Sequence, residues 1–149
     1  ELWIIPAERM KMKRPHMVPL SPQAIELLEI IKPHSGESEF LFPSEMKRGQ
    51  PRNTQTASMA LKRMGYGGRL VAHGLRALAS TTLNEQGFNP DVIEAALAHI
   101  DKNEVRAAYN RAQYLEKRKV MMCWWSDEIQ QTPSVVKSKH DNITALRTV

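Results

Sequence analysis

The sequence predicts a mainly α-helical fold with one small antiparallel β-hairpin, an α+β class. Two short apolar runs, 2–6 and 16–20, flank a basic turn, as the strands of a hairpin do. Apolar residues then recur at helical spacing in several segments, which begin at Ser-Pro or Asn-Pro and end at proline or glycine. The 149 residues are enough for one domain with a hydrophobic core.

The expected helices follow the hairpin in chain order. Ser21 and Pro22 supply an N-cap and a first-turn proline for the first helix, which we expect Pro33 to stop. Gly87 is the expected C-cap of a later helix, and Asn89-Pro90 repeats the start signal. A capping box formed by Asp101 and Glu104 opens the helix that carries Tyr109. The other expected helices span 54–64, 73–86, 90–97 and 113–129.

The composition indicates a globular protein, with 42% hydrophobic and 25% charged residues. No apolar run approaches the roughly 20 residues of a membrane span, and no secretory signal pattern occurs. The single cysteine excludes an internal disulfide and a Cys-rich zinc site. The chain begins inside an apolar run without an initiator Met, so we interpret it as a fragment that starts within a strand. We expect one domain over 1–129 and a flexible, polar tail over 130–149.

The charge is compatible with an anionic partner such as nucleic acid, and its distribution along the chain says more than its net value. The net charge is +5 and the sequence pI is about 9.5. The basic residues are clustered between apolar segments, which places them on loops or exposed faces around the core. The clusters are Arg9, Lys11, Lys13 and Arg14; Lys47, Arg48 and Arg52; and Lys62, Arg63 and Arg69.

The candidate chemistry lies between residues 72 and 110. His73 and Arg76 are three residues apart, so a helix presents both on one face. His99 follows the apolar 90–97 segment, and Tyr109 comes ten residues later. These residue types suit attack on a phosphodiester by a tyrosine. The order His-x-x-Arg, His, Tyr is far more specific than any of its parts.

Each of these residues has a defined chemical part in such a reaction. Tyr109 needs activation, because a phenol with a pKa of about 10 is a poor nucleophile at neutral pH. Arg76 offers a permanently charged, planar fork that matches phosphate oxygens and stabilises the transition state. His73 lies at a helix start, where backbone N–H groups also attract anions, and it can accept the tyrosine proton or bind phosphate. His99 is expected to donate a hydrogen bond to phosphate.

Three phrases stand beside this set: A-E-R-M-K-M-K-R-P-H, L-N-E-Q-G-F-N-P-D-V-I-E and R-A-A-Y-N-R-A-Q-Y-L. Together with the His-x-x-Arg, His, Tyr order, they resemble the tyrosine recombinases, the phage-integrase family, over about 1–129. The local phrases are most similar to integrases of prophages and genomic islands, the P4-like group. The family's usual gap after the second histidine favours Tyr109 over Tyr114 as the nucleophile.

The resemblance implies the catalytic-domain fold of a tyrosine recombinase. It also implies site-specific recombination that integrates and excises a prophage or genomic island through a 3′-phosphotyrosyl intermediate, with no cofactor and no catalytic metal. The implied partners are double-stranded DNA and, in the full-length protein, three further copies in a homotetramer. The implied location is the bacterial cytoplasm, at the nucleoid and not at a membrane. The expected DNA contacts are Arg9, Lys13, Arg14 and Arg52.

The family also places a catalytic lysine in a hairpin turn before a V-P-L-type strand. Counting back from 18–20, Lys11 matches that lysine best and Lys13 second. Such a lysine protonates the departing 5′-oxygen, since an ammonium carries several donors on a flexible stem. A solvated basic turn that touches the DNA backbone is the alternative for either lysine. We predict that this turn faces one basic cleft together with His73, Arg76 and His99.

One departure concerns the family's first catalytic arginine, which lies in an R-x-x-E-L helix before the hairpin. No such helix occurs within these 149 residues. We therefore expect the set of Lys11, His73, Arg76, His99 and Tyr109 to be incomplete. The expected consequence is that this chain is inactive alone and monomeric, and that its full-length parent is the recombinase.

Three other functions compete with this interpretation. A non-catalytic helix-turn-helix DNA-binding module explains the helices and basic loops but not the ordered residue set. A metal-dependent nuclease or phosphatase that uses His73 and His99 needs clustered carboxylates. A type IB topoisomerase shares the chemistry, but the local phrases favour an integrase. The acidic residues nearby are interpreted as helix caps and exposed faces: Asp91, Glu94, Asp101 and Glu104.

Overall fold

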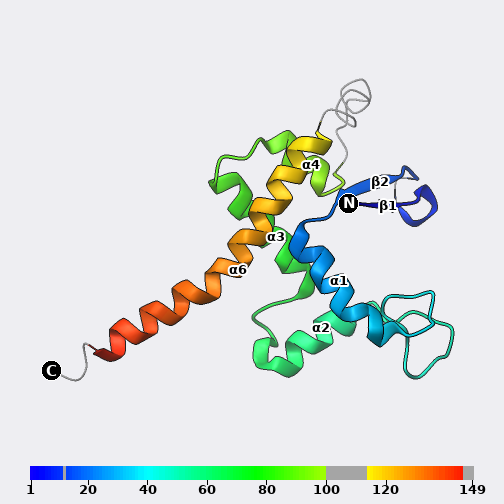
Figure 1. The fold of residues 1–149 in the computed structure, drawn as a ribbon, viewed down its shortest axis with the longest axis horizontal. Helices are drawn as coiled ribbons and strands as arrows, with labels where there is room; N and C mark the ends of the chain where they lie inside the picture. Colours follow the sequence, from blue (N-terminus) through cyan, green and yellow to red (C-terminus); the bar gives the residue numbers. More distant parts are fainter. Residues whose placement is uncertain (12, 100–113, 146–149) are drawn as a thin grey trace. The chain divides into compact units, whose positions relative to one another are not determined.

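The computed structural model describes residues 1–11, 13–99 and 114–145, from 132 onward as helical backbone. The predicted class is confirmed, because the described chain is mostly helical with a two-stranded antiparallel sheet (Figure 1). The chain divides into two compact units. The first unit combines Glu1–Gln23 with Phe88–Val149, and the second is Ala24–Gly87.

The hairpin opens the first unit. Strand β1 (Leu2–Ile5) pairs antiparallel with β2 (His16–Pro19), so that Leu2 lies opposite Pro19 and Ile5 opposite His16. The connection contains a short 3₁₀ turn, η1 (Ala7–Arg9). Pro19 has no backbone N–H and lies in the last pair of the ladder, where that loss is tolerated. Both predicted strands are confirmed to within one residue.

The core of the first unit lies between α4 (Pro90–Ala96) and α6 (Leu115–Ala145). Helix α6 also contacts β2. Val92 and Ile93 of α4 are buried, as is Met121 of α6. The rings of Phe88 and Trp124 pack at a centroid distance of 5.2 Å. The predicted start of α4 is confirmed: the Asn89 side chain accepts a hydrogen bond from the Asp91 N–H at 2.8 Å, and Pro90 is the first helical residue.

Polar side chains connect α6 to the segment around β2. The Arg118 guanidinium donates through Nη2 to the carbonyl of Met17 at 2.7 Å. Arg118 is buried, and its pKa is lowered because the charged group loses hydration. Ser21, also buried, shares a hydrogen bond of 2.6 Å with the Ser126 hydroxyl. These two bonds link residues more than a hundred positions apart in the chain.

Helix α1 (Pro22–Ser35) begins at the predicted proline, but the prediction that Pro33 stops it was wrong. A proline so near the C-terminus removes only one helical hydrogen bond, so the last turn persists. The Ser35 hydroxyl donates to the Lys32 carbonyl at 2.7 Å and satisfies a group left unpaired at the helix end. The chain leaves the helix at Gly36, whose φ is +58°.

The second unit continues with α2 (Thr56–Leu61), the π-helical turn η2 (Lys62–Tyr66) and α3 (Ala72–Glu85), and α2 contacts α3. The helix predicted over 54–64 is therefore shorter than expected. The regular α-helix ends at Leu61, and the following π-helical turn contains Gly65. Gly65 has a φ of +90°, which only glycine adopts freely. Helix α3 was predicted to within one residue at each end, and Gly87 takes the expected left-handed conformation with φ +78°.

The end of the last helix differs from the prediction. Helix α6 continues to Ala145, whereas we expected it to end at Ile129 (Figure 1). Gln130 and Gln131 are good helix formers and no glycine follows Ile129, and Pro133 lies inside α6 without ending it. The independent mobility of 130–149 stays a prediction.

Candidate functional site

Helix α3 carries the His-x-x-Arg pair in its first two turns. Its first residue is Ala72, and the preceding Val71 is extended and supplies no side-chain cap. His73 and Arg76 are both exposed and, at a spacing of three, lie on the same side of the helix. An exposed imidazole and an exposed guanidinium beside a helix N-terminus form a surface that can receive an anion.

His99 lies just beyond the C-terminal end of α4 and follows Ala98, which has a positive φ. The N–H of Leu97 donates to the Ile93 carbonyl, and the N–H of His99 reaches back to the Glu94 carbonyl at 3.0 Å. Between them Ala98 takes φ +53°, the left-handed conformation that normally falls to glycine at this place. The backbone of His99 is therefore held by its own hydrogen bond to Glu94, and it follows one residue in the left-handed conformation.

The His99 side chain has a carboxylate partner. Its Nδ1 lies 2.6 Å from Oε2 of Glu94, and both side chains are about half exposed. The prediction that Glu94 only covers an exposed face was therefore incomplete, because Glu94 holds the ring of a candidate site residue. A fold back from His99 to Glu94 requires the helix to end in a left-handed residue, and an alanine at position 98 does not predict that.

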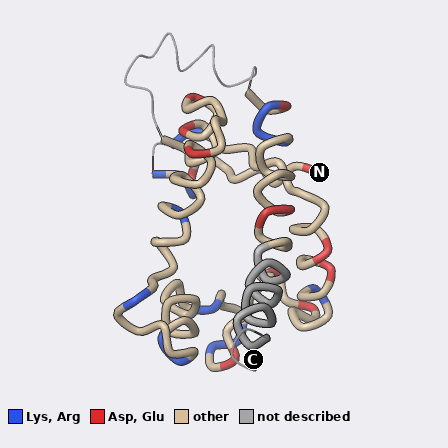
Figure 2. Tube along the Cα trace, turned by 90° about the vertical axis from the view of Figure 1, so that its left-hand side faces the viewer, with Lys and Arg blue, Asp and Glu red and all other residues tan. Residues whose placement is uncertain are grey.

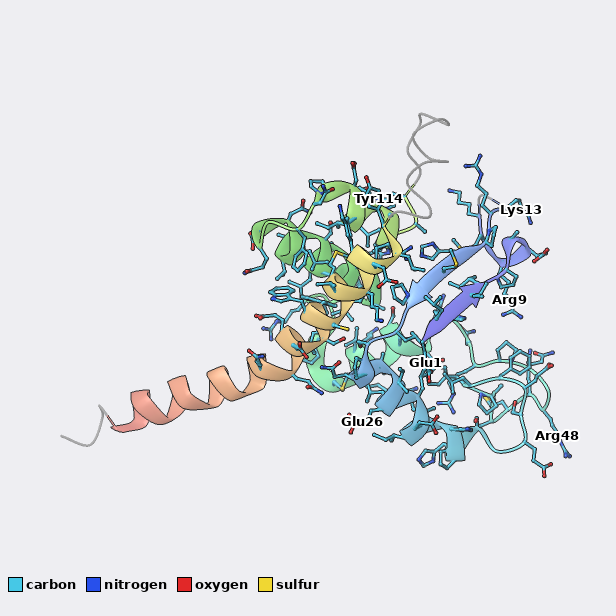
Figure 3. The ribbon with its side chains drawn as sticks, turned by 45° about the horizontal axis from the view of Figure 1, so that its top comes forward. Glu1, Arg9, Lys13, Glu26, Arg48 and Tyr114 are labelled. Atoms are coloured by element: carbon cyan, nitrogen blue, oxygen red, sulfur yellow. The ribbon has the colours of Figure 1, made fainter. Side chains whose placement is uncertain are left out.

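The turn between β1 and β2 presents the basic residues expected there. Lys11, Lys13 and Arg14 are exposed, and so is Arg9 in η1. Figure 3 shows Arg9 and Lys13 in this connection, and Figure 2 shows that Lys and Arg positions recur elsewhere in the chain. Lys13 takes φ +51°, and its N–H donates to the Met10 carbonyl at 3.0 Å. The turn therefore fixes the backbone conformation of Lys13. This conformation does not decide whether Lys11 or Lys13 is the catalytic lysine.

Arg52, the remaining expected DNA contact, lies in the loop between α1 and α2. Its Nη2 pairs with the Glu45 carboxylate, and its Nε donates to the Pro43 carbonyl at 3.4 Å. The loop closes through an isolated bridge between Pro43 and Pro51. Within this loop, Arg52 has a structural part, and its contact with DNA stays a prediction.

The candidate nucleophile, Tyr109, lies outside the described residues, as does the predicted capping box at Asp101. Its rival Tyr114 begins the described part of the chain before α6 (Figure 3). The Tyr114 hydroxyl donates to Oδ2 of Asp91 at 3.4 Å, and the Lys117 ammonium lies 5.8 Å from the ring centroid. These contacts give Tyr114 a packing role against the first turn of α4.

The predicted site residues fall in both units. His73 and Arg76 belong to the second unit, whereas Lys11 and His99 belong to the first. The prediction that all of them face one basic cleft stays a prediction. Within the described residues, no three His, Cys, Asp or Glu side chains are grouped so that they can hold a metal ion. None of the described helices is long and apolar enough to cross a membrane.

The chain belongs to the phage integrase family, whose model matches residues 1–116. That range contains every residue of the candidate set.

Curated relatives agree with the family. The chain is 63% identical over 132 residues to Prophage integrase IntA of Escherichia coli (strain K12), covering 89% of this chain and 32% of the relative. It is 45% identical over 126 residues to Prophage integrase IntZ of the same strain, covering 84% and 31%. The integrase of Enterobacteria phage P4 is 40% identical over 142 residues, covering 85% and 32%. The chain thus spans about a third of the length of these relatives. No solved structure matches it.

Proposed function

We propose that this chain forms part of the catalytic domain of a DNA recombinase that integrates and excises a prophage or genomic island. The observation that carries the proposal is the family match over 1–116, which includes the ordered set from Lys11 to Tyr109. The exposed positions of His73, Arg76 and His99 support it, because a duplex can reach only surface groups. The double-stranded DNA of the bacterial nucleoid is the proposed substrate.

The proposed reaction is a transesterification. The Tyr109 oxygen attacks phosphorus, a 3′-phosphotyrosyl bond forms, and the bond to the 5′-oxygen breaks. The phenol proton passes to a base, for which His73 is the candidate, and the leaving 5′-oxygen takes a proton from Lys11. Arg76 and His99 stabilise the charge that develops on the other phosphate oxygens. Religation reverses these steps on a new strand, so no external energy source is required.

The direct test is covalent trapping on DNA. Because the relatives are about three times as long, we would join this chain to the upstream part of Prophage integrase IntA and assay the chimera on that prophage's attachment-site DNA. A nick near the scissile phosphate lets the released strand diffuse away and traps the phosphotyrosyl adduct. We expect Tyr109→Phe to abolish the adduct, since the nucleophilic oxygen is removed.

Tyr114→Phe is the matched control, because it removes the other tyrosine hydroxyl of this region, the one that donates to Asp91. We expect it to keep the adduct. An adduct that survives Tyr109→Phe, or disappears only in Tyr114→Phe, contradicts the proposal. DNA binding with no adduct in the unchanged chimera favours a DNA-binding module, and cleavage lost in excess chelator favours a metal-dependent nuclease.

A second experiment tests whether Lys11 or Lys13 donates the proton to the leaving 5′-oxygen. A bridging sulfur in place of the 5′-oxygen gives a leaving group that departs without protonation, so it rescues only loss of the general acid. We expect Lys11→Ala to slow cleavage of ordinary DNA and to be rescued by the sulfur substrate. Lys13→Ala, which changes the neighbouring basic residue of the same turn, should weaken binding without such rescue. The opposite pattern assigns the proton to Lys13.

We further propose that the full-length protein acts as a homotetramer on two duplexes and that this chain alone is monomeric. Segment 130–149 is the proposed partner-binding arm. Its deletion from the chimera should weaken synapsis, measured as a paired-duplex complex on a native gel, and leave single-site cleavage intact. Recombination that does not change after the deletion contradicts that role.

A further inference from the structure

The contact between Glu94 and His99 defines the protonation of the ring. Glu94 Oε2 lies 2.6 Å from His99 Nδ1, and an ionised carboxylate can only accept a hydrogen bond. Nδ1 therefore carries the proton. The other ring nitrogen, Nε2, then has one function in each charge state: it accepts in the neutral ring and donates in the cationic ring.

Stability does not explain this pair. The His99 and Glu94 side chains are 50% and 54% exposed, and a surface pair of this kind contributes little to folding. The same helix end also keeps Ala98 in a left-handed conformation, a position that costs free energy for any residue with a Cβ. The Glu94–His99 pair is weak and Ala98 is strained, so this local geometry is better explained by a functional role of His99 than by stability.

We propose that Glu94 is a positioning residue for His99: its carboxylate accepts from Nδ1–H and holds the ring so that Nε2–H of the cationic form donates to a phosphate oxygen of DNA. This inference rests on the proposed recombinase function and deepens it, because it adds a residue that acts through the histidine. The carboxylate prevents the ring from turning its Nδ1 to the substrate. In the cationic ring it also balances the charge that faces the phosphate.

The first experiment measures the tautomer and needs no activity. Long-range ¹H–¹⁵N correlation spectra of the labelled 149-residue chain, recorded where the ring is neutral, distinguish a proton on Nδ1 from one on Nε2. We expect Nδ1–H at His99 in the unchanged chain and a substantial Nε2–H population in Glu94→Ala. Glu116→Ala, which removes an exposed glutamate of α6, should leave the His99 signals unchanged. An Nε2–H ring in the unchanged chain, or the same tautomer in both, overturns the proposal.

The second experiment measures cleavage by the IntA chimera. We expect Glu94→Ala to slow adduct formation at saturating DNA by about tenfold to a hundredfold, the range typical of residues that orient a histidine. Affinity for DNA should stay within about twofold, since orientation costs rate rather than binding. Glu94→Gln should restore part of the rate, because its amide oxygen still accepts from Nδ1–H.

A double substitution tests whether Glu94 acts through His99. In a His99→Ala background, Glu94→Ala should cause no further loss of rate, because the group that it positions is gone. An additive loss there, or a full rate in Glu94→Ala alone, overturns the proposal. The two proposals fail separately: an adduct in Tyr109→Phe removes the recombinase reaction, whereas the tautomer measurement still decides the link from Glu94 to His99.

Discussion

Replacing Ala98 with glycine should stabilise the first unit, although the change removes a methyl group. Ala98 has φ +53°, and an L-residue in the left-handed region costs about 1–2 kcal/mol. Glycine removes that cost but adds about 0.5–1 kcal/mol of entropy in the unfolded chain. The difference predicts a gain of about 0.5–1 kcal/mol in the free energy of unfolding.

Ala95→Gly is the matched control, because Ala95 lies inside α4 with helical geometry. In a helix, glycine only adds its entropic penalty, so we expect Ala95→Gly to lower the free energy of unfolding by about 1 kcal/mol. The same chemical change, three residues apart, should therefore shift stability in opposite directions.

Urea unfolding followed by tryptophan fluorescence measures both variants. All three tryptophans lie in the first unit, and Trp124 packs on Phe88 close to α4. With an m value of about 1–3 kcal/mol per molar urea, Ala98→Gly should raise the midpoint by about 0.2–1 M and leave m unchanged. A midpoint lowered as much as that of Ala95→Gly refutes the left-handed conformation at Ala98, and with it the described fold of the chain at His99.

Three further predictions concern the first unit and use the same urea assay. Asn89→Ala should lower stability by about 1 kcal/mol, because the N–H of Asp91 loses its cap; an unchanged midpoint contradicts that cap. Met121→Ala should lower stability by about 2–5 kcal/mol, since Met121 is fully buried and the change leaves a cavity, so a loss below 1 kcal/mol contradicts its place in the core. Arg118→Met should cost less than Arg118→Ala, because both remove the buried charge and the bond to Met17, whereas only methionine keeps the packing volume; equal losses show that packing is unimportant there.

Local signals were reliable where a single turn of backbone decides the outcome. Asn89-Pro90 predicted the start of α4, and Gly87 predicted the end of α3, because capping and left-handed φ depend on a few adjacent residues. The spacing of His73 and Arg76 predicted their place on one helix for the same reason. The prediction at Pro33 was wrong because a proline in the last turn removes only one helical hydrogen bond, and the one at Ile129 was wrong because a polar composition does not by itself end a helix.

The sequence by itself determined the α+β class, the order of the elements and the residue types of the candidate chemistry, because periodicity, caps and motif spacing are written along the chain. Only the tertiary structure showed that Arg118 donates to Met17 and that Trp124 packs on Phe88. Those contacts depend on which helix faces bury together, and no local pattern specifies that choice. The link between Glu94 and His99 also needed the structure, because an alanine at position 98 gives no sign of the left-handed turn that joins them.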